Sequence, residues 1–359
     1  MPKNVVRITL ALTFIVLAWS ARGRTQSGAP LQRPCAEEAT AAADAVAALF
    51  DDRQFVFIGS THGDLKIEEF LTCLVSRPAF TRRVTDIVVE QVSSAHQALV
   101  DRYVLSLDAV PDDSLTSIWL DTDSPTLWTT LPQVRRFLET LRDTTRTLPA
   151  ARRVRLVGGN EGIDWSKVET PEDLAPYPYK TNLVPHLLID HLAKEPRNKT
   201  LVVYGDCHIH WNGNNFMYDL EAALGRARLF VVGRIGELVP GERAFLTAVG
   251  NPDRPFFAAA DRFPANGEAP RSLRVCGGES SGKLADYMDG FVYLGPTPDR
   301  TLTGAISLTA AQQRELARRS SIKADRERTM RARSQGRARW FAAHPDDFSP
   351  RPTVSETRD

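Results

Sequence analysis

Two short segments with the same pattern each follow an apolar run and each supply a histidine. Residues 59–62 read Gly-Ser-Thr-His and residues 205–208 read Gly-Asp-Cys-His. A β-branched and aromatic run that ends in glycine is typical of a buried strand entering a loop. In an open parallel α/β sheet, ligands bind at the edge formed by the carboxyl ends of the strands. We therefore expect His62 and His208 to lie at the same edge of one sheet.

Carboxylates follow two further apolar runs. Glu90 ends the run 86–90, and Asp164 comes in the loop after the predicted strand 153–158. Histidine and a neighbouring carboxylate can act as general base and general acid near neutral pH. We predict that His62, Glu90, His208 and Asp164 are catalytic residues. The first three also form a two-histidine, one-carboxylate set that can hold a divalent metal ion.

Predicted strands and helices alternate along residues 36–308, as in repeated βαβ units. The predicted strands cover residues 55–58, 86–90, 153–158, 200–204, 228–233 and 291–294, and the predicted helices cover residues 36–50, 64–77, 94–107, 127–147, 181–194 and 215–225. The sequence thus predicts a single α/β domain with a mostly parallel central sheet and helices on both faces. Residues 240–282 interrupt the alternation with proline and glycine, which favours an irregular insertion or a lid. A capping-box pattern at Thr309 and Gln312 opens a basic helix predicted over residues 309–344, and residues 345–359 are predicted to be disordered.

The first 30 residues have the pattern of a secretory signal peptide. Lys3 and Arg7 precede the apolar run 8–19, and small residues follow it. The alternative is an uncleaved N-terminal anchor, although twelve residues are short for a membrane span. We expect a periplasmic or extracellular protein with no integral membrane segment after cleavage.

Export makes disulfides possible among the four cysteines, Cys35, Cys73, Cys207 and Cys276. Four cysteines allow three pairings, and the spacing does not choose among them. The formal net charge of +1 gives no reason to expect nucleic acid as a partner.

The order of these motifs resembles a known superfamily. A Gly-x-x-His segment, a strand-end glutamate and a second Gly-x-x-His segment are similar to the group that joins erythromycin esterases, ChaN-type haem-binding lipoproteins and the TIKI/TraB/GumN metalloproteases. Residues 155–165 and 287–296 look like pieces of uncharacterised bacterial members. The resemblance implies an EreA/ChaN-like α/β fold. One departure is Ser60, which stands where many members carry glutamate in a Gly-Glu-x-His motif.

Three functions are open at this point. The first is an exported hydrolase of an ester or amide bond in a small molecule or peptide, with or without a divalent metal ion. The second is a ligand-binding protein of the ChaN type, with His62 or His208 as an axial ligand of haem. The third is a catalytically inactive member, because Ser60 lacks the carboxylate of the family motif. The residues outside the motifs identify neither a substrate nor an oligomeric state.

Overall fold

The computed structural model describes the chain in ten stretches, and the predicted signal peptide and C-terminal tail lie outside them. All the described residues belong to one compact unit that begins at Cys35. They are residues 35, 37–129, 132–177, 183–211, 216–235, 242–263, 274–275, 278–279, 282–295 and 306–343.

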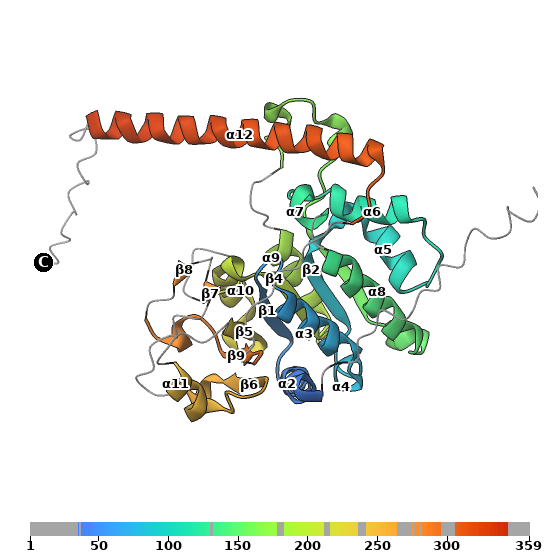
Figure 1. Ribbon diagram of the computed structural model, residues 1–359, viewed down its shortest axis with the longest axis vertical. Coiled ribbons are helices and arrows are strands. Elements are labelled where there is room, and N and C mark those ends of the chain that lie inside the picture. The colour runs from blue at the N-terminus through green and yellow to red at the C-terminus, as the bar shows by residue number, and fades with distance from the viewer. Residues whose placement is uncertain are drawn as a thin grey trace, which may run out of the picture. The chain divides into compact units, whose positions relative to one another are not determined.

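A seven-stranded sheet with the order β3-β2-β4-β1-β5-β9-β6 forms the centre of this unit (Figure 1). Neighbouring strands pair in parallel, except that β6 runs antiparallel to β9 at one edge. The predicted α/β fold with a mostly parallel sheet is confirmed. The strands are β1 (Phe55–Ser60), β2 (Asp86–Ser93), β3 (Arg155–Asn160), β4 (Thr200–Gly205), β5 (Leu229–Ile235), β6 (Phe256–Ala259) and β9 (Gly290–Tyr293).

The apolar residues of the strands alternate between two cores, because helices cover both faces of the sheet. Val56 and Ile58 of β1 face the first core, and Phe55 and Phe57 face the second. All four side chains are fully buried. This double burial explains why the strands are continuous apolar runs in the sequence.

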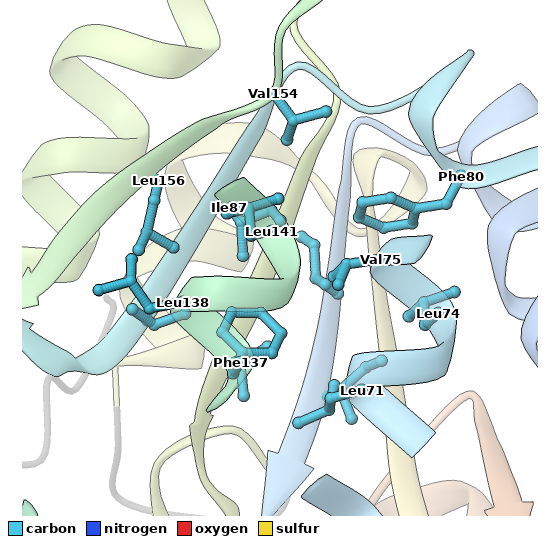
Figure 2. Close-up of a cluster of buried hydrophobic side chains, with 14 of the residues drawn as sticks. Leu71, Leu74, Val75, Phe80, Ile87, Phe137, Leu138, Leu141, Val154 and Leu156 are labelled. Atoms are coloured by element: carbon cyan, nitrogen blue, oxygen red, sulfur yellow. The ribbon is translucent and has the colours of Figure 1, made fainter. Parts of the chain in front are cut away.

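Five longer helices of the described residues pack on the first face, and the short helices that contain Phe80 and Trp128 add side chains to the same core. Figure 2 shows the apolar stripe of α8, including Phe137 and Leu141, meeting Leu71 and Leu74 of α3 over Ile87 of β2. Burying such large side chains stabilises the fold by about 1.5–3 kcal/mol each. The helices are α2 (Glu37–Ala48), α3 (Leu65–Ser76), α5 (Gln97–Val104), α6 (Asp112–Leu120) and α8 (Pro132–Arg146).

The second face is covered by shorter elements. They are α9 (Leu183–His186), a π-helical turn (Leu187–His191), α10 (Met217–Leu224) and α11 (Arg243–Val249), and they pack on residues such as Phe57 and Val202. The remaining elements are the helices α4 (Pro78–Thr81), α7 (Pro125–Thr129) and α12 (Ala310–Ala343), and a hairpin of β7 (Arg274–Val275) and β8 (Gly278–Glu279). No helix in the described stretches combines the length and apolar character needed to cross a membrane.

Three of the differences from the predicted elements concern helices and residues 240–282. The helix predicted over residues 127–147 is two helices, α7 and α8, because Pro132 lacks the backbone N–H that a continuous helix needs there. Helix α6 has no counterpart among the predicted elements. The described part of residues 240–282 contains α11 and the antiparallel edge strand β6.

Cys35 and Cys73 form a disulfide with a Cα–Cα distance of 4.9 Å. The bond ties the chain two residues before α2 to the third turn of α3, and both helices pack on the first face of the sheet. It is one of the disulfides that the sequence left open. Cys276 lies outside the described residues.

Candidate functional site

The three strands that carry the motifs lie side by side. Strand β4 lies between β1 and β2, with Ser60 opposite Gly205 and Val89 opposite Val203. Both histidines therefore follow neighbouring strand ends at the carboxyl edge of the sheet. Glu90 lies within β2, because that strand continues three residues beyond the predicted run, with an irregularity in its pairing after Val89.

His62, Glu90 and His208 meet around the backbone of Gly205. A Cβ atom at Gly205 would lie 3.1 Å from Glu90 Oε2, 3.3 Å from His208 Cδ2 and 3.4 Å from His62 Nε2. The Gly205 backbone N–H donates a 2.6 Å hydrogen bond to Glu90 Oε2. Glycine thus leaves the space in which the three side chains converge.

The His62 loop is fixed by polar contacts on both sides. Gly63 has a φ of 82°, a conformation that favours glycine, and turns the chain into α3. Asp64 caps that helix by accepting from the Lys66 backbone N–H at 3.0 Å, and its carboxylate forms a buried 2.5 Å ion pair with Arg234. Thr61 Oγ1 donates to Asp206 Oδ2 at 3.4 Å, which connects the two histidine loops.

Burial shifts the pKa values of Glu90 and His62 in opposite directions. It raises the pKa of Glu90 to about 8, helped by the nearby carboxylates Asp123 and Asp206 and opposed by the Gly205 N–H. Burial also lowers the pKa of His62 to about 4, helped by the neighbouring His208. At neutral pH the Glu90 carboxyl is therefore protonated and the His62 imidazole is neutral. His62 Nε2 and Glu90 Oε2 are 3.9 Å apart, beyond direct hydrogen-bond distance.

Aromatic rings form two walls of the site. The Trp128 ring of α7 contacts the His62 ring edge-on, with 4.8 Å between centroids. Tyr204 meets His208 edge-on at 5.4 Å, and Phe216 is stacked parallel to His208 at 6.4 Å. These rings exclude water from one side of each imidazole and hold its orientation.

The residue at the end of β3 that reaches toward this site is Asn160. Its side chain donates to Asp123 Oδ1 at 2.8 Å and accepts from the Asp123 backbone N–H at 3.0 Å. Asp123 in turn acts electrostatically on both Glu90 and His62. Sequence reasoning missed Asp123 and Asn160, because neither belongs to a histidine motif.

Asp164 lies in the loop four residues beyond the end of β3. Its side chain caps a 3₁₀ turn by accepting from Ser166 and forms a 2.7 Å ion pair with the exposed Lys167. These contacts lower the pKa of the Asp164 carboxyl. The structure therefore does not bring Asp164 together with the other three predicted residues. The reason is that β3 continues to Asn160, so the strand-end position belongs to that residue.

Helix α12 holds the wall that contains Asp123 and Trp128. Arg319 donates to the Leu120 carbonyl and forms a 2.7 Å ion pair with Asp121, and Lys323 donates to the Asp123 carbonyl. Figure 1 shows this helix passing beside α6 and α7 before it extends away. The first half of the predicted basic helix is thus part of the support of the site. Its start matches the predicted capping box, because Thr309 and Gln312 exchange hydrogen bonds.

A second buried carboxyl lies on the other face of the sheet. Ser60 Oγ donates to Glu68 Oε1 at 3.2 Å, and burial raises the pKa of Glu68 to about 7. Glu68 lines a small internal cavity of about 10 Å³ together with Gln91 and Trp119, enough for about one water molecule. A carboxyl group from α3 therefore lies beside the serine that replaces the glutamate of the family motif.

Within the described residues, no group of three His, Cys, Asp or Glu side chains has the arrangement of a metal site. The donor types at His62, Glu90 and His208 still match those that divalent transition metals prefer. Two donor atoms that bind a tetrahedral ion at about 2.1 Å each lie roughly 3.4 Å apart. The 3.9 Å between His62 Nε2 and Glu90 Oε2 is therefore only slightly longer than such a site needs.

The sequence matches no protein-family model and no curated protein. Among solved structures, a succinoglycan biosynthesis protein is similar to this chain with a TM-score of 0.50 and 11% identity, over 73% of this chain and 92% of that one. A mutant of the erythromycin esterase EreC in its open conformation has a TM-score of 0.49 and 11% identity, over 74% of this chain and 95% of that one. The haem-bound ChaN of Campylobacter jejuni has a TM-score of 0.34 and 12% identity, over 53% of this chain and 84% of that one. At 11% identity, the likeness to the succinoglycan biosynthesis protein supports the α/β fold alone.

Proposed function

We propose that the protein is a hydrolase of ester or amide bonds and that His62, Glu90 and His208 form its active site. The observation that carries the proposal is their convergence around Gly205. Two titratable groups whose pKa values are displaced in opposite directions are typical of an acid and a base assigned to separate tasks.

The protonation states assign a role to each group. Neutral His62 removes a proton from a water molecule, whose oxygen forms a bond to the carbonyl carbon of the substrate. The His208 ring donates a hydrogen bond to the resulting oxyanion. Protonated Glu90 gives its proton to the leaving oxygen or nitrogen as the bond to carbon breaks. The proton on His62 then returns to Glu90, and the site is restored.

A divalent ion, if one is bound, would be held by the same three side chains and would polarise the carbonyl group. The signal-peptide pattern supports a site of action outside the cytoplasm, on a small molecule or a peptide. The bound metal ion and the site of action outside the cytoplasm are parts of this proposal.

A panel of chromogenic esters and peptides, assayed with and without chelator, tests the hydrolase. We expect His62→Ala and Glu90→Gln to lower kcat/KM by about 10²–10⁴-fold, the usual contribution of a general acid or base. Asp164→Asn is the matched control, because its side chain caps a surface turn, and it should keep full activity. Loss of activity with chelator and its return with added metal would assign a metal-assisted reaction.

The pH profile tests the assignment of acid and base. kcat/KM should rise as His62 loses its proton near pH 4 and fall as Glu90 loses its proton near pH 8. Glu90→Gln should remove the alkaline limb and leave the acid limb in place. Absence of hydrolysis together with a Soret band of bound haem would favour the ChaN-type function instead. Absence of both would favour an inactive member.

A further inference from the structure

A strongly cationic cleft of about 500 Å³ lies at the amino edge of the sheet, at the opposite end of the strands from the candidate active site. Its lining residues directly precede the strands, as Thr85 precedes β2, Arg153 precedes β3 within two residues, and Lys199 precedes β4. Strands of six residues separate the two edges by about 20 Å. The cleft is therefore independent of the histidine site.

Six cationic side chains surround this cleft. They are Arg82, Arg83, Arg152, Arg153, Arg197 and Lys199. Among the described lining residues, Asp51 is the one carboxylate. Six cations less one carboxylate leave a formal charge of +5 in one cleft, whereas the whole chain carries only +1. The cleft therefore carries a local excess of positive charge.

Several arginines elsewhere on the described surface have carboxylate partners. Arg77 pairs with Asp44 at 2.9 Å, and Arg155 pairs with Asp101 at 2.8 Å. In the cleft, Arg83 pairs with Asp51 in this way. The other five cations form no ion pair with a carboxylate of the described residues, although Arg82 interacts electrostatically with Asp44 and Lys199 with Asp51. Like charges held together raise the free energy of the site. An anionic ligand would remove that repulsion.

Backbone carbonyls hold several of these cations in place. Arg152 donates to the Arg82 carbonyl at 2.6 Å, and Lys199 Nζ donates to the Arg53 carbonyl at 3.0 Å. The side chains of Arg82 and Arg197 make no hydrogen bond or ion pair with any residue that the structure describes. The cleft therefore combines anchored cations with two guanidinium groups that can close on a ligand.

We propose that this cleft binds a small molecule that carries two or more phosphate groups. Guanidinium groups pair with phosphate oxygens through two parallel hydrogen bonds, which suits a site built mainly from arginine. A charge of +5 calls for several negative charges on one ligand. The volume lies within the range of about 300–1,000 Å³ that is usual for small-molecule sites.

Isothermal titration calorimetry of the full chain with inorganic tripolyphosphate tests the proposal. We expect tripolyphosphate to bind at least about ten times more tightly than orthophosphate, because each added phosphate gains further charge-assisted hydrogen bonds. The double variant Arg82→Ser/Arg197→Ser should weaken tripolyphosphate binding at least about tenfold. The matched control is Arg328→Ser/Arg331→Ser, which removes the same charge from exposed positions on α12, and it should bind as the unaltered chain does.

Two outcomes would overturn the proposal. Equal weakening in both double variants would mean that only overall charge attracts the anion. Failure of the unaltered chain to bind tripolyphosphate would mean that the cleft is no phosphate site. A separate arm with vesicles that contain a phosphoinositide distinguishes the sources of the phosphate groups. Vesicle binding without tripolyphosphate binding would replace the small-molecule ligand by a membrane.

Discussion

The two ends of one parallel sheet gather polar residues in opposite ways. At the carboxyl edge, burial leaves Glu90 protonated and His62 uncharged near neutral pH. At the amino edge, Arg82 and Arg197 are exposed to solvent and keep their charge. The first environment suits proton transfer, and the second suits electrostatic recognition. Burial, more than residue type, separates the two kinds of site.

The polar groups at the two edges also differ in the partners that they need within the fold. Buried polar groups destabilise a protein unless they have partners. The carboxyl edge accordingly has the buried pair Asp64–Arg234 and the contacts of Arg319 with Asp121. The cations of the amino edge need only nearby carbonyl oxygens, because water still solvates them. Substitutions should therefore change stability strongly at the first edge and weakly at the second.

The largest effect on stability is expected at Arg319. Arg319→Ala removes the mostly buried guanidinium that donates to the Leu120 carbonyl and pairs with Asp121, which keeps His96 as a partner at 2.7 Å. We expect the free energy of unfolding to fall by about 3 kcal/mol. Urea denaturation measures this free energy of unfolding. The control Arg328→Ala, exposed on the same helix, should change it by less than about 0.5 kcal/mol.

The same variant tests whether α12 supports the active site. Loss of Arg319 should loosen residues 120–129 and lower hydrolysis, because Asp123 and Trp128 lie in that segment. Unchanged stability and unchanged hydrolysis would contradict the supporting role of the helix.

The next effect concerns Glu68. Its pKa is raised from 4.5 to about 7 in the folded protein, so the folded state binds this proton more tightly than the unfolded state does. The stability that this proton contributes is present below pH 4.5 and is lost as the pH rises to about 7. Glu68→Gln keeps a partner for Ser60 without the ionisation. We expect about 2–3 kcal/mol of added stability at pH 8 and little change at pH 4.

Urea denaturation at the two pH values measures this difference. The surface variant Glu172→Gln is the control, and it should leave stability nearly the same at both. An equal effect of Glu68→Gln at pH 4 and pH 8 would mean that Glu68 does not titrate in this range.

A smaller effect is expected where the three site residues meet. In Gly205→Ala the new methyl group would lie 3.1–3.4 Å from atoms of Glu90, His208 and His62. These side chains would have to move by a few tenths of an ångström. We expect kcat/KM to fall about tenfold, since small displacements of catalytic groups are costly, while the melting temperature changes little. Full activity would show that the reaction does not need this arrangement.

The sequence predicted those parts of the site that lie on strands. The apolar runs before His62 and His208 placed both histidines at one edge, because parallel strands share their direction. The same reasoning misplaced Asp164, since β3 ends at Asn160. A run of apolar residues does not show where a strand stops pairing with its neighbour in the sheet.

Other parts of the site had no local signal in the sequence. Asp123 lies between α6 and α7, and Trp128 lies in α7. Arg319 contacts Asp121 of the same segment from a helix almost 200 residues later. The cationic cleft is built from residues of four separate loops. Such contacts depend on the strand order, with β4 between β1 and β2. The spacing of residues along the chain does not predict this strand order.

The smallest effect is expected at the amino edge and gives the sharpest contrast. Arg82→Ser/Arg197→Ser should leave hydrolysis unchanged, because about 20 Å of strand separates the cleft from the histidines. The free energy of unfolding should change by less than about 0.5 kcal/mol, since both side chains are exposed. Tripolyphosphate at saturating concentration should raise the melting temperature of the unaltered chain and not that of the variant, because only a bound ligand stabilises the folded state. A loss of hydrolysis in this variant would show that the two edges are coupled and that the separation argued from the sheet is wrong.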